Sequence, residues 1–142
     1  MKKMSLIILV VISLANFAKA DLNLPLKNYL EDKQLDESST QIFLLKRCSA
    51  IYAYASGVIL KSNALSSKNF IEISNNLLFK SVELMIIDGN MKFEKAQTEA
   101  ENNRKELFNN YIADGKKNWE KNKSHFKGSY IADDMAICSK LT

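Results

Sequence analysis

Proline and glycine are both scarce in this chain, which has one proline and four glycines among 142 residues. An all-β sandwich needs a turn roughly every 8 to 12 residues, and such turns draw heavily on these two residue types. The scarcity therefore argues against a many-stranded β fold. Long stretches rich in Leu, Lys, Glu, Ala and Asn instead predict an all-α protein.

The apolar run near the start of the sequence lacks the length to cross a bilayer. This run, Leu6 to Leu14, has about half of the roughly 20 residues that a membrane-spanning helix needs. Lys2 and Lys3 precede the run, and the small-x-small pattern Ala18-Lys19-Ala20 follows it. We expect residues 1–20 to be a Sec-type signal peptide cleaved after Ala20, which leaves no transmembrane segment and a periplasmic or secreted protein.

A net excess of charge of either sign is nearly absent once this signal peptide is removed. The whole chain has 20 basic and 16 acidic side chains, but Lys2, Lys3 and Lys19 leave with the signal and no acid does. The expected mature charge is therefore +1. Nucleic acid is an unlikely partner on this ground, because its binding scales with clustered positive charge.

Cysteine and histidine are too few for a structural zinc site. The chain has two cysteines, Cys48 and Cys138, and one histidine, His125, whereas such a site takes four ligands. The cysteines are also too far apart for a CxxC redox motif. In an oxidising compartment an even pair favours one disulfide, so we expect a Cys48–Cys138 bond, no metal site and no cofactor.

The expected mature chain contains enough residues for one domain and too few for two. We expect residues 21–40 to be an N-terminal arm, in which apolar residues from Leu22 to Leu30 can form a short helix, and residues 41–142 to be the helical domain. Apolar residues at three- and four-residue steps predict a first long helix that carries Cys48 on its buried side. A second helix is expected from about Ser66 to Asp88-Gly89, with the glycine supplying the left-handed end.

A third helix is expected from about Asn90, and it either ends at Asp114-Gly115 or resumes through Trp119. A last helix from about Tyr130 places Cys138 on its apolar face. A bond from Cys48 to Cys138 then fastens this helix to the first long one. The sequence as a whole predicts a small antiparallel bundle of about four helices.

The most suggestive surface segment combines lysines with aromatic side chains near the end of the third helix. Lysines beside rings can bind anionic lipid headgroups or polyanions. The alternative is that the rings pack on the bundle while the lysines form a solvated face, and the small net charge favours this. The residues concerned are Lys116, Lys117, Trp119, Lys121, Lys123, His125, Phe126 and Lys127.

Two tyrosines and a glycine stand out within the first long helix. Gly57 in a helix interior costs about 1 kcal/mol, and its default interpretation is close packing against another helix. The functional alternative is a groove in which Tyr52 and Tyr54 meet a ligand or peptide.

Catalytic machinery is not evident. His125 and Ser124 are adjacent, and adjacent residues do not face each other on a helix. Asp133 and Asp134 can in principle bind a cation, but near the start of the last helix they more simply complement the positive end of its dipole. We therefore expect a non-enzymatic protein that binds a protein partner in the bacterial envelope or periplasm. Anionic lipid or polyanion binding through Lys116–Lys127 is the alternative, and an enzyme is the least supported.

Overall fold

The computed structural model describes residues 25–142, and its regular structure in that range is entirely helical. The predicted all-α fold with four longer helices is confirmed. The predicted signal peptide, residues 1–20, lies outside the described residues, as do residues 21–24 of the predicted arm. The described elements are α2 (Leu26–Leu30), α3 (Ser38–Ile59), α4 (Ala64–Ile87), α5 (Phe93–Asn122), α6 (Tyr130–Cys138) and the short 3-10 helix η1 (Ser139–Leu141).

α3 and α4 form a tightly packed antiparallel hairpin. Buried serines lie along their contact, and the hydroxyl of each donates to the backbone carbonyl of its partner. These donor–acceptor distances are 2.7 to 2.8 Å for Ser49 with Ser74 and 2.9 to 3.0 Å for Ser56 with Ser67. Because serine side chains are small, the two backbones can come close. Because each hydroxyl is hydrogen-bonded, no buried polar group in these two pairs is left unpaired.

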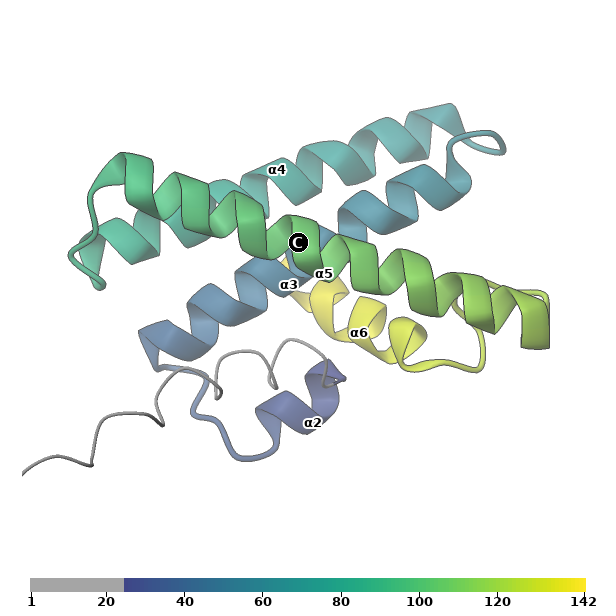
Figure 1. Cartoon of the computed structure of the whole chain (residues 1–142), viewed down its shortest axis with the longest axis horizontal. Coiled ribbons are helices and arrows are strands. Elements are labelled where there is room, and N and C mark those ends of the chain that lie inside the picture. The colour runs from purple at the N-terminus through teal and green to yellow at the C-terminus, as the bar shows by residue number, and fades with distance from the viewer. Residues whose placement is uncertain (1–24) are drawn as a thin grey trace, which may run out of the picture.

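α5 lies across this hairpin and is the longest described helix, with 30 residues. Figure 1 shows it in green, passing in front of α3, with α6 in yellow folding back beneath its second half. Its buried positions recur at three- to four-residue steps, as expected for one face of a helix against a core. They are Ala96, Ala100, Leu107, Tyr111, Gly115 and Asn118.

The predicted disulfide is confirmed and ties the end of α6 to the middle of α3. Cys48 and Cys138 are both fully buried, with their Cα atoms 5.3 Å apart. Leu26 of α2 is fully buried as well, so the segment predicted to be an arm contributes to the core. The first and last α-helices of the described chain, α2 and α6, therefore both pack against the centre of the bundle.

Two helix ends differ in detail from expectation. α4 ends at Ile87, close to the predicted stop, but Asn90 rather than Gly89 adopts the left-handed conformation, with a φ of 49°. Asn is among the few non-glycine residues that tolerate this region. At Asp114-Gly115 the helix does not end, because α5 continues to Asn122 and the backbone turns left-handed at Lys123. Gly115 therefore lies within α5 and does not terminate a helix.

Candidate binding groove

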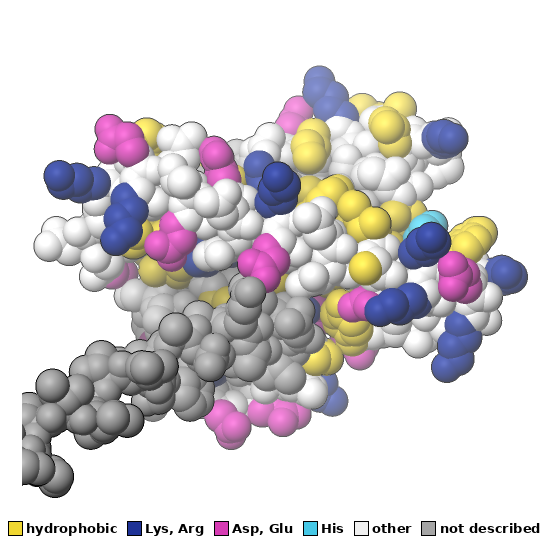
Figure 2. Space-filling model, in the orientation of Figure 1, with side chains coloured by type: hydrophobic (Ala, Val, Ile, Leu, Met, Phe, Trp, Pro, Cys, Tyr) yellow, Lys and Arg dark blue, Asp and Glu magenta, His cyan; other side chains and the backbone are white. Residues whose placement is uncertain are grey.

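An apolar groove lies between α5 and the α3–α4 hairpin. It consists of two adjoining hollows of about 430 and 350 Å³ that share Phe108 as a wall. Figure 2 shows hydrophobic side chains gathered at this place, beside the histidine. We call this feature the groove. The first hollow is lined by Ala53, Ile71, Asn75, Glu101, Arg104, Lys105 and Phe108, and the second by Tyr54, Gly57, Val58, Phe108, Ile112 and His125.

Large apolar side chains are left partly open to solvent in the groove. Ile71 of α4 is 40% exposed and Ile112 of α5 is 45% exposed. Single exposed apolar residues are ordinary, but a contiguous set that lines a hollow is typical of a binding surface.

Gly57 helps to keep the second hollow open. A Cβ built at this residue meets no atom within 4 Å, and the residue is exposed. The default interpretation of Gly57 as a site of close helix packing is therefore wrong, because no neighbouring element covers the face of α3 that carries Gly57. The observed setting is that of the functional alternative, a groove beside Tyr54.

Close packing occurs instead at Gly115 of α5. A Cβ at this position would collide with the hydroxyl of Tyr54. Gly115 thus lets the Tyr54 ring enter between α3 and α5, where burial raises the pKa of Tyr54 to about 12. The phenol consequently keeps its proton at alkaline pH values at which a free tyrosine has lost it.

Tyr54, His125 and Trp119 form a contiguous cluster at one end of the groove. The Tyr54 hydroxyl lies 3.1 Å from Nδ1 of His125, within hydrogen-bond distance. The imidazole stacks on the Trp119 indole, with ring centroids 5.0 Å apart and planes inclined at 24°. Trp119 remains 47% exposed, so this cluster offers both an apolar surface and a polar group to a bound molecule.

Asn118 holds the loop that carries His125. Its side-chain amide donates to the carbonyls of Ser124 at 2.7 Å and Lys127 at 3.0 Å. The hydroxyl of Ser124 in turn accepts from the backbone N–H of Lys127 at 2.9 Å. These contacts fix the position of His125 although it lies outside any helix, and they give Ser124 a structural role.

Tyr52 does not join Tyr54 in the groove. Its ring packs edge-on against Phe70, and its hydroxyl lies 3.3 Å from Oγ1 of Thr142. Tyr52 is itself buried, and residues two apart on a helix point in different directions. The structure therefore brings only one of the two predicted tyrosines to the candidate site.

The lysines of the basic segment do not form one face. All five are exposed, but along α5 Lys116 lies on the same side as Trp119, whereas Lys117 and Lys121 point more than a quarter-turn away. Lys117 forms an ion pair with Asp114 at 3.1 Å. Phe126 packs against the core and contacts Tyr54 with ring centroids 5.7 Å apart. Lys123 and Lys127 lie beyond the end of α5.

A buried ionic cluster joins α3, α5 and α6, and sequence reasoning missed it. Arg47 of α3 donates from Nη2 to Oδ2 of Asp134 at 2.8 Å and from Nε to the Tyr111 hydroxyl at 2.7 Å. The Tyr111 hydroxyl donates to the same carboxylate oxygen, also at 2.7 Å. Oδ1 of Asp134 accepts the backbone N–H of Leu26 at 2.7 Å.

This cluster is structural rather than a site for a ligand. The exposed fractions of Arg47, Tyr111 and Asp134 are 2%, 1% and 0%, so no substrate reaches them. Burial by itself disfavours the guanidinium charge, but the contacts with Tyr111 and Asp134 outweigh this effect and raise the pKa of Arg47. Asp133 is exposed, so the two adjacent acids have different roles, and the helix-dipole interpretation misses the role of Asp134.

A sequence signal for this cluster exists. Arg47 lies directly before Cys48 within an apolar stretch, and Asp134 lies four residues before Cys138 on the same face of its helix. A disulfide between the two cysteines therefore places the acid near the base. Because a buried charge needs a counter-charge, the pair can be inferred once the cross-link is assumed.

Among the described residues no group of three or more His, Cys, Asp or Glu side chains is arranged to hold a metal ion. One described helix, α3, has the length and apolar composition of a membrane span. Its most apolar stretch is 56% buried against the rest of the molecule, as also happens to a core helix of a globular protein.

Comparisons of the chain with protein-family models, with curated proteins and with solved structures find no match.

Proposed function

We propose that this protein is a non-enzymatic, exported helical protein that acts by binding a protein partner through the groove. The observation that carries the proposal is the contiguous apolar lining between α3, α4 and α5, where Ile71 and Ile112 are each at least 40% exposed. Covering such a surface releases about 25 cal/mol for each Å² of apolar area removed from water. A rigid, disulfide-tied scaffold also limits the conformational entropy that binding costs.

Two further observations support a binding role over a catalytic one. The cluster at the end of the groove has a neutral phenol and an imidazole, but within residues 25–142 the contacts of His125 are with Tyr54 and Trp119 and with no carboxylate that would orient it as a general base. The buried acid Asp134 is closed to solvent. An apolar groove with a few fixed polar groups is typical of a recognition surface.

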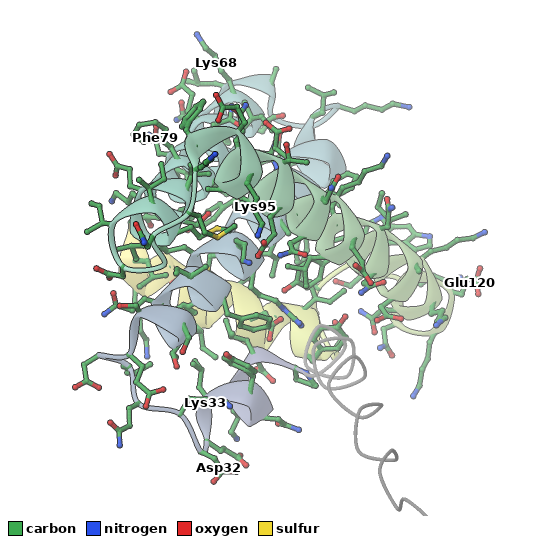
Figure 3. The ribbon with its side chains drawn as sticks, turned by 60° about the vertical axis from the view of Figure 1, so that its left-hand side comes forward. Asp32, Lys33, Lys68, Phe79, Lys95 and Glu120 are labelled. Carbon is green, nitrogen blue, oxygen red and sulfur yellow. A yellow bond between two sulfur atoms is a disulfide. The ribbon has the colours of Figure 1, made fainter. Side chains whose placement is uncertain are left out.

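The binding proposal can be tested by photo-crosslinking in the native cell envelope. A photoreactive residue at Lys105, on the rim of the groove, is expected to form a discrete protein adduct. Ile112→Glu places a charge in the apolar lining and is expected to abolish that adduct. Phe79→Glu is the matched control, because Phe79 is 60% exposed on α4 but does not line the groove. Figure 3 shows Phe79 on α4 across the view from Glu120, which lies in the last turn of α5.

An adduct that persists in Ile112→Glu, or that disappears equally in Phe79→Glu, would contradict partner binding through the groove. Activity of the wild-type protein on a substrate panel without any adduct would favour the enzyme alternative.

The export proposal rests on the predicted signal peptide and is supported by the disulfide, since oxidising compartments preserve such bonds. Intact mass spectrometry of protein from its own cells is expected to show a chain without residues 1–20 and with two hydrogens fewer than the dithiol. Full-length, reduced protein in the cytosol would contradict export.

A further inference from the structure

We propose that the occupant of the groove is an amphipathic α-helix that carries acidic residues along one flank. This inference rests on the proposed function and adds the chemical class of the partner segment. Three features of the groove carry it: its length, the helical character of its walls and the sign of the charges on its rim.

The length of the groove suits a short helix. Along α5 its apolar wall is made by Phe108 and Ile112, one turn apart, with Arg104 one turn before them and Lys116 one turn after. Residues 104 to 116 span about 18 Å at roughly 1.5 Å per residue. About three turns of a partner helix cover this distance, with apolar residues at three- and four-residue steps toward the groove.

The walls of the groove favour a helix over an extended segment. A peptide that binds as a β-strand needs an open sheet edge for its backbone hydrogen bonds. The part of the chain that the structure describes contains no strand, and the groove walls are helices whose own backbones are hydrogen-bonded internally. A helical segment brings its backbone groups already paired and needs only side-chain contacts.

The charges on the α5 rim are mostly positive. Arg104 and Lys105 line the first hollow, and Lys116 follows Ile112 by one turn. Within residues 25–142 no carboxylate forms an ion pair with any of these three cations. Glu101 is the acid among the lining residues, and it accepts from the amide of Gln97 at 3.0 Å.

Arg104 is also positioned by the opposite wall. Its Nη1 donates to Oδ1 of Asn75 on α4 at 3.0 Å. A guanidinium has five N–H donors, so this contact orients the group while other donors remain for a ligand carboxylate.

The same charges disfavour a second copy of this chain as the occupant. In a two-fold symmetric pair the same patch meets itself, and the basic rims of two grooves would then lie near each other. Acidic side chains on the partner complement the rim, which is how electrostatics gives specificity to an interface.

The test is selection from a displayed library of helical peptides against the oxidised mature protein, with both the apolar face and the flanks randomised. Enriched peptides are expected to combine an apolar stripe with Asp or Glu on one flank. Their affinity is expected to fall at least tenfold in Ile112→Glu and to stay within twofold in Phe79→Glu. Circular dichroism confirms that each variant is folded.

A charge-reversed target sharpens the selection. The variant Lys105→Glu/Lys116→Glu replaces two exposed side chains. Against this variant, the flank residues of the enriched peptides are expected to change from acidic to basic. Enriched peptides without an acidic excess, peptides indifferent to the reversal, or no groove-dependent peptide at all would each overturn the inference. If the Lys105 photo-adduct remains groove-dependent in that case, the partner-binding proposal stands and only the acidic-helix inference fails.

Discussion

The two halves of α3 meet different surroundings. Around Arg47 and Cys48 the helix is enclosed by α2, α5 and α6, and its charge is neutralised inside the core. One to three turns later, from Ala53 to Val58, the same helix borders an open groove with small and apolar side chains. The enclosed part contains the disulfide and the buried ion pair, whereas the open part borders the groove to which we assign partner binding. Substitutions in the two halves should therefore have separable effects.

The largest expected effect is the loss of the disulfide in the enclosed half. Cys48→Ala/Cys138→Ala opens a loop closed over a sequence separation of 90, and the chain-entropy model predicts a loss of about 4 to 5 kcal/mol in unfolding free energy. Urea denaturation of the variant and the oxidised wild type measures this difference. A change below about 1 kcal/mol would mean that packing alone fixes α6 on α3.

Removing the buried acid should have nearly as large an effect. Asp134→Ala leaves the Arg47 guanidinium without its counter-charge and the Leu26 N–H without its acceptor, which we expect to cost about 3 to 5 kcal/mol. Denaturant unfolding provides the measurement. Asp133→Ala is the matched control, because this neighbouring acid is exposed, and little change is expected.

A double variant identifies the source of that cost. Replacing both partners, as Arg47→Met/Asp134→Leu, removes the unpaired charge and should recover part of the lost stability. Equal losses in the double variant and Asp134→Ala would show that hydrogen bonds, rather than an uncompensated charge, account for the effect.

Substitutions at two glycines allow a direct comparison of the packed and open surfaces. Gly115→Ala drives a methyl group into the Tyr54 hydroxyl and should cost about 1 to 3 kcal/mol through overpacking. Gly57→Ala adds the same methyl group where no atom lies within 4 Å, and should instead stabilise the helix by up to about 1 kcal/mol. Thermal unfolding of both variants reveals the sign of each change, and two losses would contradict an open surface at Gly57.

The smallest expected effect is a loss of stability at alkaline pH. Burial raises the pKa of Tyr54 to about 12, so between pH 10 and 12 the folded protein holds a proton that the unfolded chain has released. Stability must therefore fall as pH rises through this window and be unaffected by Tyr54 below it. We expect Tyr54 to account for a loss of about 1 to 2 kcal/mol in unfolding free energy. This is less than the free energy equivalent to its full pKa shift, because the groove admits solvent beside the ring.

Denaturant titrations from pH 8 to 12 measure this decline. Tyr54→Phe should lose less stability over the window than the wild type. Burial also raises the pKa of Tyr111 and Tyr130, so the decline should become shallower without vanishing.

The sequence predicts those features that depend on local pattern. Helical periodicity indicates four longer helices, because it can be recognised within each segment alone. The presence of two cysteines indicates the cross-link, because it requires only a count. The Arg47–Asp134 pair joins positions 87 residues apart, and the spacing of four residues to Cys138 is the local feature that distinguishes Asp134 from its exposed neighbour Asp133. Only the assumed disulfide brings the two segments together.

The groove was still harder to predict. The helical period assigns Phe108 to the buried face of α5, but does not reveal that Phe108 is the shared wall of two hollows. Gly57 faces open space, whereas Gly115 is in close contact with Tyr54, and this difference depends on where α5 crosses α3. Both facts belong to tertiary packing, which periodicity within a single helix does not encode.

The pairing of Arg47 with Asp134 also has a consequence for biosynthesis. A ribosome makes the positive charge early and its neutralising carboxylate 87 residues later. While the intervening chain emerges, the α3–α4 hairpin must keep the guanidinium hydrated, since dehydrating it alone is too costly. The polypeptide therefore completes this buried ion pair only after α6 has been translated.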